Sequence, residues 1–130
     1  MNKLDLIPGE RIIDDSFRKI QRLIVESMNP LDIDSYERFQ EYILMSTQET
    51  IDKIYLSHYQ KYYLLFEYFT DSNQDRLYIV EKIELIQYIA ECFDEEYGDG
   101  LDITVANMLY QALFLGNHDG MLMKIPEADF

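Results

Sequence analysis

The sequence predicts an α+β domain dominated by about four helices with a small antiparallel β-hairpin or sheet, and an all-α fold is the alternative. Three observations support this prediction. Apolar residues recur at helical spacing in several stretches, two short aromatic and β-branched runs flank a polar segment, and 130 residues with 48% hydrophobic content suit one domain. We therefore expect a single compact domain over residues 1–130, with an irregular lead-in over residues 1–13 and a tail over residues 126–130.

The first predicted helix begins at Asp14 or Asp15, because either side chain can cap it. It ends at Asn29-Pro30, because proline cannot continue the helical hydrogen-bond ladder. Three cations fall outside its apolar stripe and give it a mildly basic outer face. The stripe consists of Phe17, Ile20, Leu23, Ile24 and Met28, and the cations are Arg18, Lys19 and Arg22.

The second predicted helix is the longest periodic segment of the chain and is capped by Asp34 or Ser35. Polar residues fall mostly outside its apolar stripe, as expected for a helix with one buried face. The stripe consists of Tyr36, Phe39, Tyr42, Ile43, Ile51 and Ile54.

A β-hairpin is predicted between residues 62 and 81. Tyr62–Phe69 and Leu77–Val80 have the aromatic and β-branched content of strands, and the polar run Thr70–Asp75 has the composition of a turn. A pair of helices is the alternative for this segment, because short apolar runs do not reveal their period.

Helical spacing returns from about Lys82 to Tyr97, and Gly98 is placed to end that helix. Its expected inward residues are Ile83, Ile86, Ile89, Ala90 and Phe93.

A final helix, capped by Asp102 or Thr104, is predicted to run to about Leu115 and to end at Gly116. It is apolar on most sides, so we expect it in the centre of the core. The segment Met121–Ile125 is predicted to form a third strand beside the hairpin.

Negative charge is concentrated in the second half of the chain. The net charge is −14; residues 1–65 hold 11 acidic and 8 basic side chains, whereas residues 66–130 hold 14 and 3. No lysine or arginine occurs between Lys82 and Lys124. A field of this sign repels nucleic acid and anionic lipid and attracts basic protein surfaces, so direct nucleic-acid or membrane binding is not expected.

Residue types suited to catalysis are sparse. Two acidic residues, Glu91 and Asp94, lie within two positions of Cys92 and raise a thiol pKa, so Cys92 is predicted to be a buried structural residue. His58 and His118 lack the spacing of metal ligands. The run from Asp71 to Asp75 resembles half of an EF-hand loop but lacks its glycine and its bidentate glutamate, so a hairpin turn is favoured.

The helix over residues 82–97 and the loop that follows it carry the predicted binding residues. Acidic positions three or four residues apart lie about 5–6 Å from one another on a helix, a spacing comparable to that of phosphates along a nucleic-acid strand. The predicted partner-binding residues are Glu84, Tyr88, Glu91, Asp94, Glu95, Glu96, Asp99 and Asp102. Of these, Asp94, Asp99 and Asp102 are weak candidates for metal ligands, and a solvated acidic loop is the simpler interpretation.

These observations favour an acidic protein-interaction module over an enzyme, with no cofactor. We expect it to bind a basic, nucleic-acid-handling protein as an inhibitor that imitates nucleic-acid charge. One alternative is a structural subunit of a homo-oligomer that uses surplus tyrosines at its interface, since the chain has 11 of them. Another is a small carboxylate- or metal-dependent enzyme. No signal peptide is recognisable at the N-terminus, so a cytoplasmic location is expected.

Overall fold

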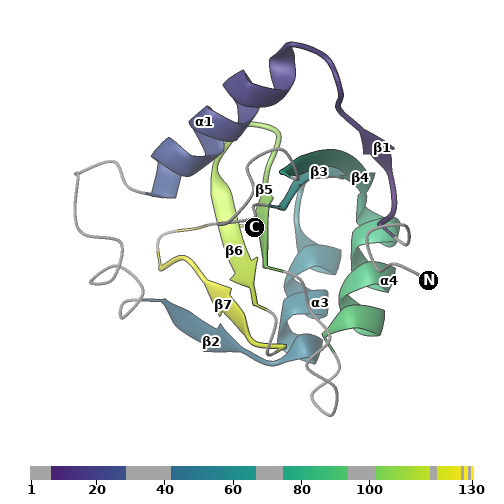
Figure 1. Ribbon diagram of the computed structural model, residues 1–130. Helices are drawn as coiled ribbons and strands as arrows, with labels where there is room; N and C mark the ends of the chain where they lie inside the picture. The colour runs from purple at the N-terminus through teal and green to yellow at the C-terminus, as the bar shows by residue number, and fades with distance from the viewer. Residues whose placement is uncertain are drawn as a thin grey trace.

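The computed structural model describes residues 7–28, 42–66, 75–93, 102–117, 120–126, 128 and 130. Within these residues the chain forms three helices and one seven-stranded antiparallel sheet (Figure 1). The helices are α1 (Ser16–Met28), α3 (Thr47–Leu56) and α4 (Lys82–Cys92). The strands are β1 (Glu10–Arg11), β2 (Ile43–Met45), β3 (Lys61–Phe66), β4 (Arg76–Glu81), β5 (Ile103–Ala106), β6 (Ala112–Gly116) and β7 (Leu122–Lys124).

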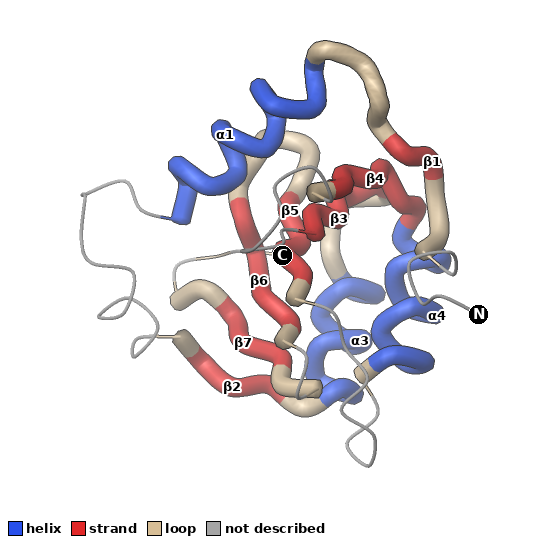
Figure 2. The backbone as a smooth tube through the Cα atoms, in the orientation of Figure 1, coloured by secondary structure: helices blue, strands red, loops and turns tan. Residues whose placement is uncertain are grey.

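The sheet has the strand order β1-β4-β3-β5-β6-β7-β2, so the short strands β1 and β2 are its edges. Helix α1 covers one face, and α3 and α4 lie side by side on the other (Figures 1 and 2). Each face has its own hydrophobic core, one including Ile24 of α1 and the other including Ile54 of α3 and Ile89 of α4. The prediction of a helix-dominated domain with about four helices and a small sheet is therefore wrong.

The predicted hairpin is confirmed by the pairing of β3 with β4, whose register runs from Lys61 opposite Glu81 to Phe66 opposite Arg76. Side chains of a strand alternate between the two faces of the sheet. Accordingly, Leu64 and Phe66 pack toward α3 and α4, whereas Leu65 packs toward α1. Because both faces are covered, successive residues of β3 are buried and its sequence reads as a continuous apolar run.

The first predicted helix is also confirmed. Asp14 caps α1, since its carboxylate accepts a hydrogen bond from the backbone N–H of Ser16 at 2.9 Å. Ile20 and Ile24 are buried, and the three predicted cations are exposed.

The second predicted helix is wrong over residues 43–45, whereas its last part, from Thr47, is helical. Residues 29–41 lie outside the described residues, and Ile43–Met45 forms edge strand β2, paired with β7. A helix begins only at Thr47, where the Ser46 side chain accepts a hydrogen bond from the N–H of Glu49. The two isoleucines at the end of the predicted stripe do lie on a helix, whereas Ile43 is half exposed. Local capping by Ser46 and pairing with a distant strand therefore overrode the apparent period.

The predicted final helix over residues 102–115 is wrong, because β5 and β6 form a central antiparallel pair there. The segment is apolar on most sides because both faces of these strands are covered. The turn between them is shaped by Asn107, whose buried side chain accepts hydrogen bonds from the N–H groups of Leu109 and Gln111. Residues 122–124 form the predicted strand, but it pairs with β6 and β2 and not with the hairpin.

Candidate functional site

Helix α4 presents a different face to the core from the one that its sequence predicts. Its buried residues are Leu85, Tyr88 and Ile89, and Phe93 directly after it is also buried. Ile83 and Ala90, both predicted to face inward, are exposed. The helix has apolar residues on most of its circumference, so only its packing against the sheet decides which of them are covered.

For this reason the predicted position of Tyr88 on the outer side of the helix is wrong. The residue is only 5% exposed, and its ring makes edge-to-face contacts with Phe66 and Phe93 at centroid distances of 6.4 and 6.5 Å. These contacts place it in the core between α4 and the sheet.

The predicted acidic residues on α4 differ in their surroundings. Glu84 is half-buried and caps its own helix: its carboxylate accepts a hydrogen bond from the backbone N–H of Glu81 at 3.0 Å, as part of a capping box. Glu91 is exposed, and Asp102 is half-buried directly before β5. The remaining predicted residues, Asp94, Glu95, Glu96 and Asp99, lie outside the described residues.

The sheet register brings the flanks of several acidic segments together at one end of the sheet. Phe66 pairs with both Arg76 and Ile103, Ile103 pairs with Gly116, and Gly116 pairs with Leu122. These five residues form one row across the sheet, here called the acidic end. The segments 67–74, 94–101 and 118–119 begin or end within two residues of this row.

Helix α4 also ends at the acidic end. A Cβ atom on Gly116 would lie 2.5 Å from the Phe93 ring and 3.0 Å from the Ile103 side chain, so the three residues are in close contact. The Phe93 carbonyl accepts a hydrogen bond from the Thr47 hydroxyl in the first turn of α3. Exposed Glu91 therefore lies near the ends of the acidic segments, although its neighbour Tyr88 does not contribute to the surface.

The described framework carries little of the net charge. Its residues include 11 acidic and 9 basic side chains, whereas the remaining residues include 14 acidic and 2 basic ones. Seven of these 14 belong to the three segments that flank the acidic end, and those segments hold no lysine or arginine. The seven are Glu67, Asp71, Asp94, Glu95, Glu96, Asp99 and Asp119.

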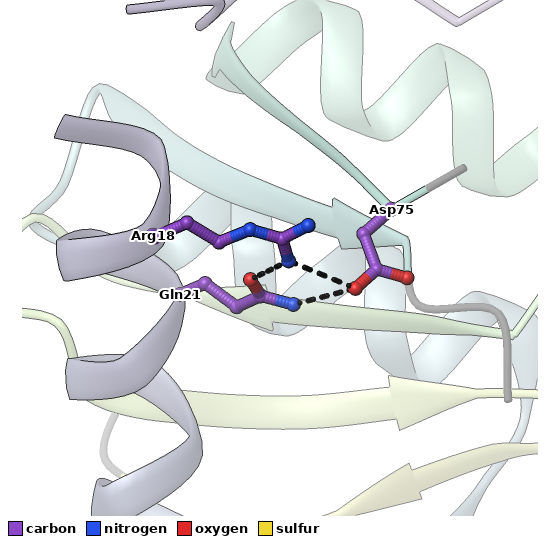
Figure 3. Close-up of polar contacts among 3 residues, drawn as sticks. All are labelled: Arg18, Gln21 and Asp75. Carbon is purple, nitrogen blue, oxygen red and sulfur yellow. Dashed lines mark hydrogen bonds and ion pairs between the residues drawn. The ribbon is translucent and has the colours of Figure 1, made fainter. Parts of the chain in front are cut away.

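Asp75, at the start of β4, has a structural role (Figure 3). Its carboxylate accepts hydrogen bonds from Arg18 at 3.2 Å and from Gln21 at 3.0 Å, both on α1. The Asp75 side chain is 8% exposed and that of Arg18 is 58% exposed. This contact joins α1 to the start of β4, and residues 71–74 of the EF-hand-like run lie outside the described residues.

Two of the three cysteine and histidine residues weighed for catalysis or metal binding lie in the described part of the chain. Cys92 is half-buried against the core and His58 is exposed, whereas His118 lies outside the described residues. Among the residues that the structure describes, no three histidine, cysteine or carboxylate side chains form a group that could hold a metal ion. No helix in the described part of the chain is long and apolar enough to span a bilayer.

Most tyrosines of the described chain belong to the core or its margin. Burial raises the pKa of the Tyr62 phenol, and its hydrogen bond with the Ser57 hydroxyl opposes that effect. Burial also raises the pKa of Tyr63, as does Tyr110, whose ring stacks on it with a centroid distance of 5.6 Å. Tyr55 is the exception, with 70% of its surface exposed.

Tyr55 belongs to a surface hollow that the sequence analysis did not identify. The hollow has a volume of about 420 Å³ and lies between the end of α3 and the start of α4. The sequence contains a pattern that could have indicated this surface. Tyr55 and Leu56 directly follow buried Ile54, so the apolar surface of α3 extends beyond its inner face. The hollow is lined by Tyr55, Gln60, Lys61, Glu81, Lys82, Ile83 and Ile86.

Comparisons with known proteins place the chain in no family: no family model, no curated protein and no solved structure matches it.

Proposed function

We propose that the chain is an acidic interaction module that binds a basic, nucleic-acid-handling protein and inhibits it by imitating nucleic-acid charge. The observation that carries this proposal is the register of the sheet. It gathers the flanks of the acidic segments 67–74, 94–101 and 118–119 in one row of paired residues. Asp102 and exposed Glu91 add to the negative charge near the same row.

The distribution of charge supports a role in recognition. Like charges close together reduce folding stability, so an acidic group without nearby cations carries an energetic cost. In this chain the described framework is almost balanced in charge, and the excess of acidic residues lies outside it. Charge in this position steers a basic partner toward one end of the molecule and accelerates association at low salt.

A charge-neutralising variant with a matched control tests the proposal. The test variant is Asp94→Asn with Glu95→Gln and Glu96→Gln, and the control variant is Glu10→Gln with Glu26→Gln and Asp52→Asn. Both variants lose three negative charges, and all three control positions are exposed and lie outside the acidic segments. Each protein is immobilised and exposed to lysate of its host at low salt, and bound protein is eluted with salt or with excess duplex DNA.

The proposal expects a basic nucleic-acid-binding protein to be retained by the wild-type and control proteins and lost by the test variant. Excess DNA should displace that protein, because both ligands would compete for one cationic surface. Equal retention by the two variants, or failure of DNA to displace the bound protein, would contradict the proposal.

A further inference from the structure

Helix α4 is apolar on its outer face as well as on its inner face. Ile83 is 58% exposed, Ile86 is half-buried and Ala90 is exposed, and they recur at helical spacing on the side away from the sheet. A helix that is apolar on most sides is normally covered on most sides. We therefore expect another protein surface to cover the outer face of α4.

Helix α3 continues this apolar surface. It packs beside α4 on the same face of the sheet (Figure 2). Its last two residues, Tyr55 and Leu56, are 70% and 78% exposed. Hydrogen bonds connect the two helices at this surface. Lys82 Nζ, at the start of α4, donates to the carbonyls of Tyr55 at 3.2 Å and Ser57 at 2.8 Å, at the end of α3. These two hydrogen bonds tie the start of α4 to the end of α3, and such preorganisation lowers the entropic cost of binding.

Charged groups of opposite sign lie at the two ends of this surface. Lys61 and Lys82 line the hollow near the start of α4, beside a single acidic residue, Glu81. Glu91 is exposed near the end of α4. A surface with this polarity is complementary to itself when a second copy is turned by a two-fold rotation.

We infer that the outer face of α3 and α4 binds a second copy of this chain in a symmetric dimer. The two α4 helices run antiparallel, with Ile86 and Gln87 at the two-fold axis. Ile83 then packs over Ala90 of the second copy, whose small side chain allows close approach. Lys61 and Lys82 face Glu91 of the second copy. Glu91 belongs both to this interface and to the surroundings of the acidic end, whereas the lysines and isoleucines of the interface are not part of the partner site of the proposed function.

The size of the face sets the expected strength of the dimer. Helix α4 has 11 residues, and two adjacent helices of this length present a face of about 16 by 20 Å. This is about 320 Å² on each copy, or about 640 Å² in total, which is below the range for stable specific complexes and corresponds to a weak, transient dimer. Dissociation is therefore expected at micromolar concentration, so the mass must be measured over a dilution series.

Sedimentation velocity of the purified full chain, from micromolar to millimolar concentration, tests the inference. The test variant is Ile83→Glu, and the matched control is Ile13→Glu, an 83% exposed isoleucine in the lead-in to α1. Both substitutions add one negative charge at an exposed isoleucine, so neither should unfold the monomer. The wild-type and Ile13→Glu proteins should form dimers over the series, and Ile83→Glu should remain monomeric.

Charge reversal tests the antiparallel arrangement. Lys61→Glu and Glu91→Lys should each raise the dissociation constant, and their combination should return it toward the wild-type value, because the two positions meet across the two-fold axis. A wild-type protein that is monomeric throughout the series overturns the inference. A dimer that survives Ile83→Glu but is lost in Leu44→Glu also overturns it, because that dimer uses the exposed edge strand β2.

Discussion

The contact between Phe93 and Gly116 allows a sharp test of the way in which α4 is joined to the sheet. Phe93 is fully buried, and a Cβ atom on Gly116 would lie 2.5 and 2.6 Å from two atoms of its ring and 3.0 Å from a side-chain carbon of Ile103. Distances this short require the ring to move. Gly116→Ala should therefore lower the free energy of unfolding by about 1–3 kcal/mol, the usual cost of overpacking a core.

The second substitution, Phe93→Leu, removes the ring atoms that approach Gly116 most closely. In that background the added methyl group meets no ring, and alanine restricts the unfolded chain more than glycine does. Gly116→Ala should then be neutral or should raise the free energy of unfolding by about 0.4–1 kcal/mol. The sign of the effect thus depends on the residue at position 93.

Urea denaturation of the wild type, the two single variants and the double variant measures this coupling. The midpoint should change while the dependence of unfolding free energy on urea stays constant, so that the difference reflects stability alone. The expected coupling energy is the difference between the two effects, about 1–4 kcal/mol, which is in the upper part of the range for residues in direct contact or just above it. Equal costs of Gly116→Ala in both backgrounds would refute the placement of the Phe93 ring against β6.

Three further predictions concern stability. Asp75→Ala should lower the free energy of unfolding by about 1–3 kcal/mol, because it leaves the buried Gln21 amide without this acceptor. Arg18→Ala should lower it by less, because the Arg18 side chain is 58% exposed. Tyr88→Ala should cost about 3–5 kcal/mol, the range for large aromatic truncations in a core. Burial raises the pKa of Tyr62 above its ordinary value of 10.0, so the folded state favours the neutral phenol. Its contribution to the free energy of unfolding is therefore fully present below pH 10 and is lost as pH rises through the folded-state pKa. Tyr62→Phe should therefore make unfolding free energy fall less steeply above pH 10.

Each of these predictions has a control. Urea denaturation of Ile83→Ala should show a change below about 0.5 kcal/mol, and a cost equal to that of Tyr88→Ala would contradict the orientation of α4. An Arg18→Ala variant that is destabilised more than Asp75→Ala would contradict the structural role given to the carboxylate. The pH dependence is followed by urea denaturation at several alkaline pH values, together with ultraviolet absorbance of tyrosinate. Identical slopes for Tyr62→Phe and wild type would contradict the assignment to Tyr62.

Local sequence signals were sufficient for α1 and for the β3–β4 hairpin. Helix α1 has a side-chain cap at Asp14 and one clear apolar stripe, so its period is unambiguous. The hairpin has two strand-like runs about a polar turn, and short-range pairing needs no information from elsewhere in the chain. The acidity was equally readable, because net charge is a property of composition.

The remaining strands depended on distant partners. The segment over residues 103–116 is apolar along its whole length because helices cover both faces of the sheet, and such a run has no period that separates a strand from a buried helix. Residues 43–45 form a strand because β7 lies beside them, and β7 comes from the other end of the chain. No local propensity within a three-residue segment could specify that pairing.

The candidate site shows the same division. The sequence alone determined that acidic residues lie on and after α4, and exposed Glu91 follows from that pattern. Only the tertiary structure decided that Tyr88 faces the core and Ile83 the surface, because an 11-residue helix that is apolar on most sides takes its orientation from the sheet on which it packs. The sheet register likewise brought the flanks of the acidic segments into one row, since hydrogen bonding between strands distant in sequence is a property of the folded chain.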